Sequence, residues 1–512
     1  MDYSLLFEAY TAQHGQQGWS RQRLLHACLR SAIRQGTLAA GTALAPSRAL
    51  AEELGVARNT VLYAYEQLAS EGFVQCDRRG TVVAAVPLQA AALQSAVPLA
   101  QAGLSQRMSN LRLSPPSAAP GGAPPPAGQM GAFVPGVPAL DQFPLAAWRR
   151  LLERAWRSVT PAQLNYGDPA GEWPLRVAIA DHLRAARGVV CDATQVFITD
   201  GTQSSLDLCL RALADVGDTI WIEHPGYAGA LAAARGASLN VTGIEVDEEG
   251  IAPQPDDWLL RPPRLIYTTP SHQYPLGSVL SLRRRVALLD AARRAAALII
   301  EDDYDSEFRH DGAPLSAMQG LAPDAPVVYL GTFSKTMFPS LRIGFVVVPA
   351  TLVPGFAQMR AHASARGRVA EQLALAEFLH SGQFARHVRR MRRLYRQRRD
   401  ALVAAVEQHL GARVTLHGVS AGMHLVLCFK DASWRDEVIS QQLLAHGIVA
   451  EALSAKAVQG ALAVQGLVLG YAQVPAEQMD VLIRRMAALL PPATTAAART
   501  SRRSQNKAKA KA

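Results

Sequence analysis

The sequence is poor in cysteine and contains no long apolar run. It has five cysteines, which lie far apart in the chain: Cys28, Cys76, Cys191, Cys209 and Cys428. Neither a disulfide framework nor a zinc site is therefore expected, and a reducing cytoplasm is the simplest location. No stretch reaches the roughly 18 consecutive apolar residues of a membrane helix. Residues 1–13 also lack the basic start and apolar run of a secretory signal.

Residues 1–86 also lack an excess of one charge sign. The chain has 512 residues, which favours two or more domains, and its net charge is +10. The last 14 residues hold six basic residues and no acid, whereas residues 1–86 hold eight arginines and seven acids. Net charge is therefore weak evidence for a nucleic-acid partner.

Shifts in composition predict four regions. Residues 1–85 have helical patterns and end in two short strand-like segments, and residues 86–130 are a Pro/Ala-rich linker that cannot bury enough apolar surface to fold. Residues 131–492 alternate apolar strands with helices, which is typical of an α/β domain with a largely parallel sheet. Residues 493–512 form a basic tail, which we expect to be disordered.

A helix-turn-helix pattern lies in the first region. Ser47 is expected to cap a helix, which Gly55 ends at the tight turn of such a motif. A second helix begins near Arg58. Its exposed start offers hydrogen-bonding side chains to base edges in a DNA groove: Arg58, Asn59 and Thr60. A small helical bundle with surface arginines is the alternative interpretation.

A strand, a turn and a second strand follow from Phe73 to Val83. This pattern predicts a wing, in which Arg78, Arg79 and Gly80 lie on phosphate or in the minor groove.

The segment PSRALAEELGVARNTVLYAYEQLASEGFV resembles the core of GntR-type winged helices almost throughout. The resemblance implies DNA contacts by Arg48, Arg58, Thr60 and Gly80. One departure is Ala57, where the family commonly carries a serine that caps the recognition helix. This loss is expected to cost about 1 kcal/mol of helix stability and to remove no base-reading group.

Four motifs follow in the large region. In QVFITDGTQSS, a strand enters a glycine turn at a helix start, where Gly201, Thr202 and Gln203 can hold a phosphate. In IWIEHPGYAGA, Tyr227 can stack on a flat ring; a tyrosine at the edge of the core is the alternative.

The third motif, AALIIEDDYDSEFRH, places four carboxylates within five residues after an apolar strand, where open α/β sheets bind their ligands. They are Glu301, Asp302, Asp303 and Asp305. They repel each other unless one faces a cation, and a protonated pyridine nitrogen is such a cation. We predict that Asp302 faces it and that Tyr304 bonds the ring hydroxyl. The alternatives are a metal site and a solvated acidic turn.

The fourth motif, VVYLGTFSKTMFPSLRIGF, contains Lys335. The chain has only six lysines against 46 arginines, and three of the six lie in the tail. Only an amine can deprotonate and form a Schiff base with an aldehyde, so Lys335 is the predicted attachment point of pyridoxal 5′-phosphate (PLP). Thr332, Ser334 and Arg342 are expected to hold the cofactor phosphate.

Together the four motifs resemble a fold-type I, class I aminotransferase-like PLP domain over residues 131–490. The same resemblance implies that Tyr166 reaches a phosphate across a dimer. Two positions depart from the aminotransferase pattern. Tyr274 stands where an asparagine usually bonds the ring hydroxyl, and Val468 stands where an arginine usually holds the substrate α-carboxylate. We therefore expect an effector that lacks this carboxylate, is anchored differently, or is PLP itself.

Both halves together resemble the MocR/GabR family of regulators. This resemblance implies an α+β winged helix-turn-helix domain joined to an α/β fold-type I domain. It further implies a PLP cofactor, double-stranded DNA with two half-sites, a small amine or PLP effector, and a head-to-tail homodimer. The large domain would sense rather than catalyse. The alternatives are an active aminotransferase with an appended DNA-binding domain and a degenerate domain that only dimerises.

The run RHVRRMRRLYRQRRD, residues 386–400, is a basic helical stretch. It is either a solvated face or a surface that follows bound DNA.

Overall fold

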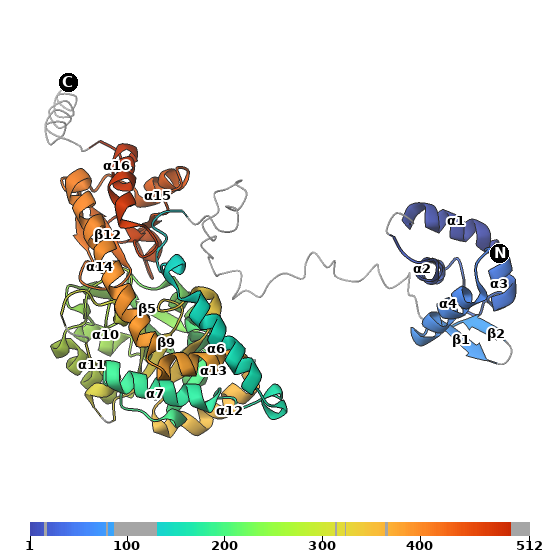
Figure 1. Cartoon of the computed structure of the whole chain (residues 1–512), viewed down its shortest axis with the longest axis horizontal. Helices are drawn as coiled ribbons and strands as arrows, with labels where there is room; N and C mark the ends of the chain where they lie inside the picture. Colours follow the sequence, from blue (N-terminus) through green and yellow to red (C-terminus); the bar gives the residue numbers. More distant parts are fainter. Residues whose placement is uncertain are drawn as a thin grey trace. The chain divides into compact units, whose positions relative to one another are not determined.

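The computed structural model describes residues 1–14, 18–77, 80–85, 131–312, 315–322, 324–363 and 367–492. The chain divides into two compact units, residues 1–104 and 105–512, which are described one at a time (Figure 1). The predicted linker and the predicted basic tail lie outside the described residues, as do Arg78 and Arg79.

The first unit is a winged helix. Its elements are α1 (Tyr3–His14), α2 (Arg21–Arg34), α3 (Ser47–Glu53), α4 (Arg58–Ser70), β1 (Val74–Asp77) and β2 (Gly80–Val83). Buried residues from all four helices and both strands form one core. The two strands pair antiparallel, with Val74 opposite Val83 and Asp77 opposite Gly80. The predicted wing is therefore present.

Helices α3 and α4 form the predicted helix-turn-helix. Gly55 turns the chain between them with a φ of 58°, a value that favours glycine. The predicted cap at Ser47 is wrong. Pro46 has the extended backbone that precedes a helix, so Ser47 is the first helical residue. The Ser47 hydroxyl instead accepts a hydrogen bond from Arg58 Nε at 3.4 Å, which links the two helices.

The second unit contains an eight-stranded sheet. Its strands are β3 (Val196–Thr199), β4 (Thr219–His224), β5 (Asn240–Asp247), β6 (Gly250–Ile251), β7 (Leu265–Thr268), β8 (Leu298–Asp303), β9 (Val327–Thr332) and β10 (Gly344–Val347). The order is β3-β10-β9-β8-β7-β4-β5-β6, in which the five strands from β9 to β5 are parallel. Strands β10 and β6 run antiparallel to their neighbours.

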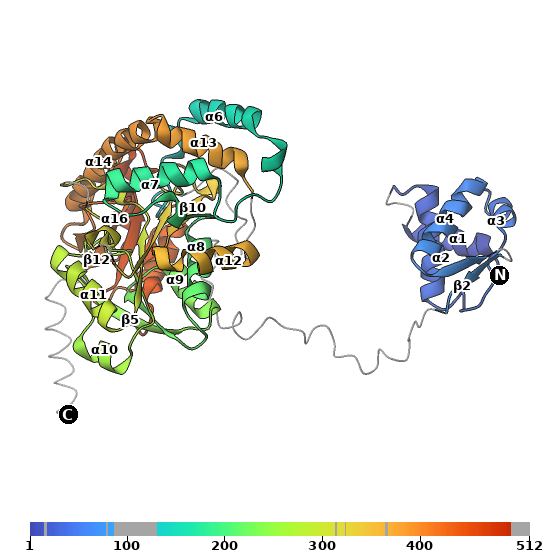
Figure 2. The same cartoon turned by 90° about the horizontal axis from the view of Figure 1, so that it is seen from below.

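Helices cover both faces of this sheet (Figure 2). One face packs against α8 (Thr202–Leu213), α9 (Ala228–Gly236) and α12 (Val353–Ala363). The other packs against α6 (Leu145–Ser158), α7 (Trp173–Arg187), α13 (Val369–His380) and α11 (Leu282–Arg294), while the short α10 (Pro255–Leu260) lies at the α11 end. Because both faces are buried, the strands are almost continuously apolar.

A second sheet of four antiparallel strands has the order β11-β12-β14-β13. Its strands are β11 (Val414–His417), β12 (His424–Phe429), β13 (Glu451–Ala452) and β14 (Gly466–Gly470). It packs against α14 (Gln383–Leu410), α15 (Asp436–Leu444) and α16 (Met479–Leu489). The start of the 28-residue α14 contributes Phe384 and Val388 to the core of the large sheet, and the rest of α14 belongs to the core of the small sheet. One helix therefore joins the two cores.

The basic run lies within α14, but its arginines differ in environment. Arg386, Arg389, Arg390 and Arg393 are exposed, whereas Arg398 is buried and donates a hydrogen bond to the Ala472 carbonyl. The exposed arginines are compatible with a solvated face, from which Arg398 is excluded, and a contact of this helix with DNA stays a prediction. Over the described ranges, no helix combines the length and apolar character that crossing a membrane requires.

Candidate ligand cavity and nucleic-acid interface

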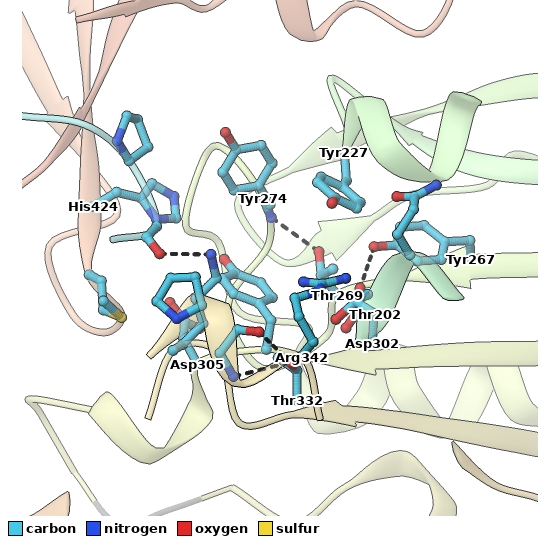
Figure 3. Close-up of a pocket in the computed structure, with 18 residues that line it drawn as sticks. Thr202, Tyr227, Tyr267, Thr269, Tyr274, Asp302, Asp305, Thr332, Arg342 and His424 are labelled. Atoms are coloured by element: carbon cyan, nitrogen blue, oxygen red, sulfur yellow. Dashed lines mark hydrogen bonds between the residues drawn. The ribbon is translucent and has the colours of Figure 1, made fainter. Parts of the chain in front are cut away.

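The carboxyl ends of β4, β7, β8 and β9 meet at a cavity of about 280 Å³ (Figure 3). This is the edge of a parallel sheet where ligands bind. Nine of the predicted site residues line the cavity: Thr202, Gln203, Tyr227, Asp302, Tyr304, Thr332, Ser334, Lys335 and Arg342. Residues more than 130 positions apart in the sequence thus surround one space.

Lys335 follows the end of β9. Its Nζ donates a hydrogen bond to the Gly136 carbonyl at 2.8 Å. A Cβ at Gly136 would lie 2.5 Å from this Nζ, so the backbone approaches the amine because residue 136 is glycine. Burial lowers the pKa of the Lys335 amine, although Asp305 and Asp302 oppose this shift. A lowered pKa increases the fraction of the neutral, nucleophilic amine.

Asp302 lies at the end of β8. Its Oδ2 accepts a hydrogen bond from the Tyr267 hydroxyl at 2.7 Å. Its Oδ1 is buried and has no hydrogen-bond partner in the part of the chain that the structure describes. Burial raises the pKa of Asp302 to about 7. This carboxylate therefore requires a cation or a donor on the cavity side.

Glu301, Asp303 and Asp305 each have other partners in the protein. Glu301 accepts hydrogen bonds from two backbone amides, Asp303 forms an ion pair with Arg187 at 2.7 Å, and Asp305 Oδ2 lies 3.1 Å from His272 Nδ1. Glu301, Asp302, Asp303 and Asp305 are at most 7% exposed. The alternative of a solvated acidic turn is therefore wrong.

The start of α8 and the Arg342 guanidinium lie side by side. Gly201 precedes this helix with a φ of 91°, and a Cβ there would lie 3.0 Å from the Arg342 guanidinium. Arg342 Nη2 donates to the Asp200 carbonyl at 2.7 Å, which holds the guanidinium beside the helix start. Thr332 and Ser334, hydrogen-bonded to each other at 3.1 Å, line the same cavity. A helix N-terminus and a guanidinium together favour a phosphate.

Four tyrosines line the cavity: Tyr227, Tyr267, Tyr274 and Tyr304. The rings of Tyr227 and Tyr274 meet edge to face, with centroids 6.0 Å apart. The Tyr304 hydroxyl donates to the His272 carbonyl at 2.9 Å. Tyr166 lies outside this cavity and is 82% exposed, so its contact with a phosphate of a partner subunit stays a prediction.

Sequence reasoning missed several lining residues: Pro135, Gly136, Tyr267, Thr269, Asp305, Met423 and His424. Tyr267 and Thr269 stand at the end of β7, where the rule for parallel sheets could have found them. Gly136 and His424 lie far from every motif, and only the folded chain brings them to the cavity.

The first unit presents a different surface. Arg48, Arg58, Asn59 and Gly80 are exposed, as a DNA interface requires. The predicted exposure of Thr60 is wrong, because its side chain is only 8% exposed. Thr60 shares a stripe of four-residue spacing with the fully buried Ala64 and Leu68, so it faces the core.

Tyr63 was missed as a candidate contact on this surface. It is 41% exposed and lies four residues after Asn59, on the same face of α4. Helical spacing from Asn59 could have indicated it.

Two protein families match the chain. Residues 23–83 match the bacterial regulatory proteins of the gntR family, and residues 136–486 match the class I and II aminotransferases. The probable rhizopine catabolism regulatory protein MocR of Rhizobium meliloti is 40% identical over 460 residues, 89% of this chain and 91% of that protein. The chain belongs to the MocR-type transcriptional regulators.

Other members of this MocR-type family match over most of their length. The pyridoxine biosynthesis regulator PdxR of Corynebacterium glutamicum is 32% identical, over 83% of this chain and 86% of its own. TauR of Rhodobacter capsulatus is 31% identical, over 78% and 82% respectively.

Solved structures agree with the fold of the large unit. LysN, an α-aminoadipate aminotransferase of Thermus thermophilus complexed with N-(5′-phosphopyridoxyl)-L-leucine, is 26% identical. It aligns with a TM-score of 0.65 over 71% of this chain and 92% of its own. The predicted fold class is confirmed: this MocR-type regulator joins a DNA-binding winged helix to a fold-type I aminotransferase domain.

Proposed function

We propose that this regulator binds operator DNA through its winged helix and senses a small amine, or PLP itself, in the cavity around Lys335. The observation that carries the proposal is the cavity itself. It brings an amine with a lowered pKa, a carboxylate with an unpartnered oxygen and an anion site into one space.

PLP is the cofactor of the class I aminotransferase domain, and when bound it supplies an aldehyde that condenses reversibly with primary amines. The residues present fit this group. Asp302 Oδ1 would accept a hydrogen bond from the protonated ring nitrogen, Tyr227 would lie against the ring, and Tyr304 would approach its hydroxyl. Arg342 and the start of α8, which begins after Gly201 with Thr202 and Gln203, would hold the phosphate together with Thr332 and Ser334.

The response requires a second copy of the chain. In a head-to-tail homodimer, Tyr166 would reach the phosphate in the partner subunit, and the two winged helices would contact two half-sites through Arg48, Arg58, Asn59 and Gly80. Occupancy of the cavity changes DNA binding only if the effector binds the two arrangements of the dimer with different affinity. A cytoplasmic location follows from this role.

The apolar surroundings of Val468 favour a sensing role over turnover as an aminotransferase. This side chain is fully buried on β14 against Val426, Cys428 and Leu453. Apart from Arg342 at the anion site, no described lining residue of the cavity carries a guanidinium. The usual holder of a substrate α-carboxylate is therefore missing. Formation of pyridoxamine phosphate from added amines would support the aminotransferase alternative.

Replacement of the amine tests the proposal. We expect Lys335→Ala to lose the visible absorption of bound PLP and the effect of PLP or amines on DNA binding. Lys430→Ala is the matched control, because Lys430 is exposed and donates only to the Gly411 carbonyl. A colourless wild-type protein, or a Lys335→Ala variant that keeps the absorption, would contradict the proposal.

A further inference from the structure

One end of the cavity is not used by the groups assigned to PLP. Lys335, Asp302 and Arg342 would hold its aldehyde, ring nitrogen and phosphate. Nine lining residues remain. Of these, Tyr267 donates to Asp302, Thr269 donates to Glu223, and Pro339 belongs to the segment between Lys335 and Arg342. The other six are taken together as the effector wall: Pro135, Gly136, Tyr274, Asp305, Met423 and His424. This effector wall is where the rest of a bound amine would lie.

Apart from Lys335, whose amine would be bonded to PLP, and Arg342, no described lining residue of the cavity carries a positive charge. Arg342 is bonded to the Asp200 carbonyl at the opposite, anion end. Lys456 is not part of the lining, and its Nζ forms an ion pair with Glu451 at 2.5 Å. The same Nζ lies 5.7 Å from the ring centroid of Tyr274. The charge of Lys456 is thus already balanced.

His424 adds no positive charge either. It is 2% exposed, and burial holds its pKa well below the usual range of histidine. At neutral pH the imidazole is therefore uncharged, and its Nε2 lies 3.0 Å from the Pro275 carbonyl. A neutral imidazole cannot compensate for the burial of an effector carboxylate.

Asp305 makes the effector wall acidic. It is 2% exposed, and its Oδ2 is engaged with His272. Its Oδ1 is buried without a hydrogen-bond partner among the residues that the structure describes. This oxygen would repel a carboxylate, and it would accept a hydrogen bond from a hydroxyl or an ammonium group.

We infer that the effector is a small amine that carries a hydrogen-bond donor, a hydroxyl or a second ammonium group, in place of a carboxylate. The inference rests on the proposed function, because the amine has to reach PLP at Lys335. The effector is small because the cavity of about 280 Å³ holds the cofactor as well.

A matched panel of amines on the full-length, PLP-loaded protein tests this inference. The panel consists of ethanolamine, 1,2-diaminoethane, glycine and ethylamine, with 4-aminobutanol, 1,4-diaminobutane, 4-aminobutyrate and butylamine as the longer set. We expect an amino alcohol or a diamine to change the visible absorption at about tenfold lower concentration than the amino acid and the alkylamine of the same length. The alcohol and diamine arms show which donor is recognised.

Two variants of Asp305 test whether this residue causes the preference for donor-bearing amines. Asp305→Ala removes the acceptor, so the advantage of the donor-bearing amine over the alkylamine should fall to about threefold or less. Asp305→Asn keeps an acceptor without the charge, so it should retain a response to the alcohol and lose that to the diamine. Asp311→Ala is the control, because Asp311 lies on the same loop, is exposed and pairs with Arg399 at 3.0 Å.

The outcomes separate the inference from the proposed function. PLP content, measured after alkaline release, is the second readout and normalises each response. A wild-type protein that takes up no PLP overturns the proposed function. A PLP-loaded wild-type protein that prefers the amino acids, or responds to none of the amines, overturns only this inference. The wild-type panel alone decides these cases, so the inference can be overturned even if a variant fails to fold.

Discussion

The two units of this chain place their functional side chains in opposite environments. On the winged helix, Arg58 and Asn59 are exposed at the start of α4 and contribute little to the core beneath them. In the large unit, Asp302 and Asp305 are at most 3% exposed, and each has one oxygen without a described hydrogen-bond partner.

Because of this difference, side chains that bind DNA and side chains that bind a ligand should affect the stability of the fold differently. An exposed side chain can be removed with little effect on folding, because water replaces its contacts. A buried charge without a partner destabilises the fold until a ligand supplies that partner. Truncation of Arg58 or Asn59 should therefore change DNA affinity alone, whereas substitution of Asp302 or Asp305 should change ligand affinity and stability together.

The largest expected effect is on DNA affinity. Arg58→Ala removes a guanidinium from the start of the recognition helix, and one good contact between a side chain and a base is worth about 1–3 kcal/mol. We expect affinity for the DNA upstream of this protein's own gene to fall roughly 5- to 150-fold at fixed salt, measured by fluorescence anisotropy, with no change in thermal stability.

Arg34→Ala is the control for this substitution, because Arg34 is an exposed arginine on α2 of the same unit. If both variants lose the same affinity, charge alone binds the DNA and α4 is not the reading element. A large drop in the melting temperature of Arg58→Ala would contradict the separation of binding from stability.

The second prediction concerns the cavity and depends on pH. The pKa of Asp302 is raised by burial to about 7, so the folded chain keeps a proton that the unfolded chain releases near pH 4. Without PLP, the free energy of unfolding should therefore fall as pH rises from about 4 to about 7. Asp302→Asn removes the contribution of Asp302 to this dependence, whereas Glu307, whose pKa burial also raises to about 7, keeps its own.

We expect PLP-depleted Asp302→Asn to be more stable than the wild type at pH 8, by roughly 1–3 kcal/mol, and equally stable below about pH 4. The same variant should bind PLP at least about tenfold more weakly. Denaturant unfolding and PLP titration measure the two effects. Asp290→Asn, at an exposed position of α11, should change neither. Equal destabilisation of Asp302→Asn at both pH values would show that its charge is not the cause.

The smallest expected effect is on the stability of the winged helix. Ala57 precedes α4 and offers no side-chain hydrogen bond to the helix start. Ala57→Ser supplies this cap and should stabilise α4 by about 0.5–1 kcal/mol. Amide hydrogen exchange of α4 in the full-length protein measures the gain, while the exchange of α8 is the internal reference. Unchanged protection of α4 would mean that the new hydroxyl does not reach the backbone amides.

The local motifs of the cavity were predictable because each follows a strand or begins a helix in the sequence. The strand before Asp302, the glycine turn at Gly201 and the loop with Lys335 all carry such signals. Tertiary packing decided the rest. Thr60 was wrongly placed on the surface because a helical start does not tell which of three successive polar residues faces the core. Ser47 was wrongly assigned as a cap because Pro46 already provides the extended residue before the helix.

By itself, the sequence determined which chemical groups this protein possesses: a scarce lysine after an apolar strand, a carboxylate after another, and a recognition helix with hydrogen-bonding residues at its start. These follow from local order along the chain. Only the tertiary structure decided that Asp305 and His424 form an effector wall without an unpaired cation in its described residues. That property depends on which residues of two sheets meet across a cavity, and no local pattern encodes such a meeting.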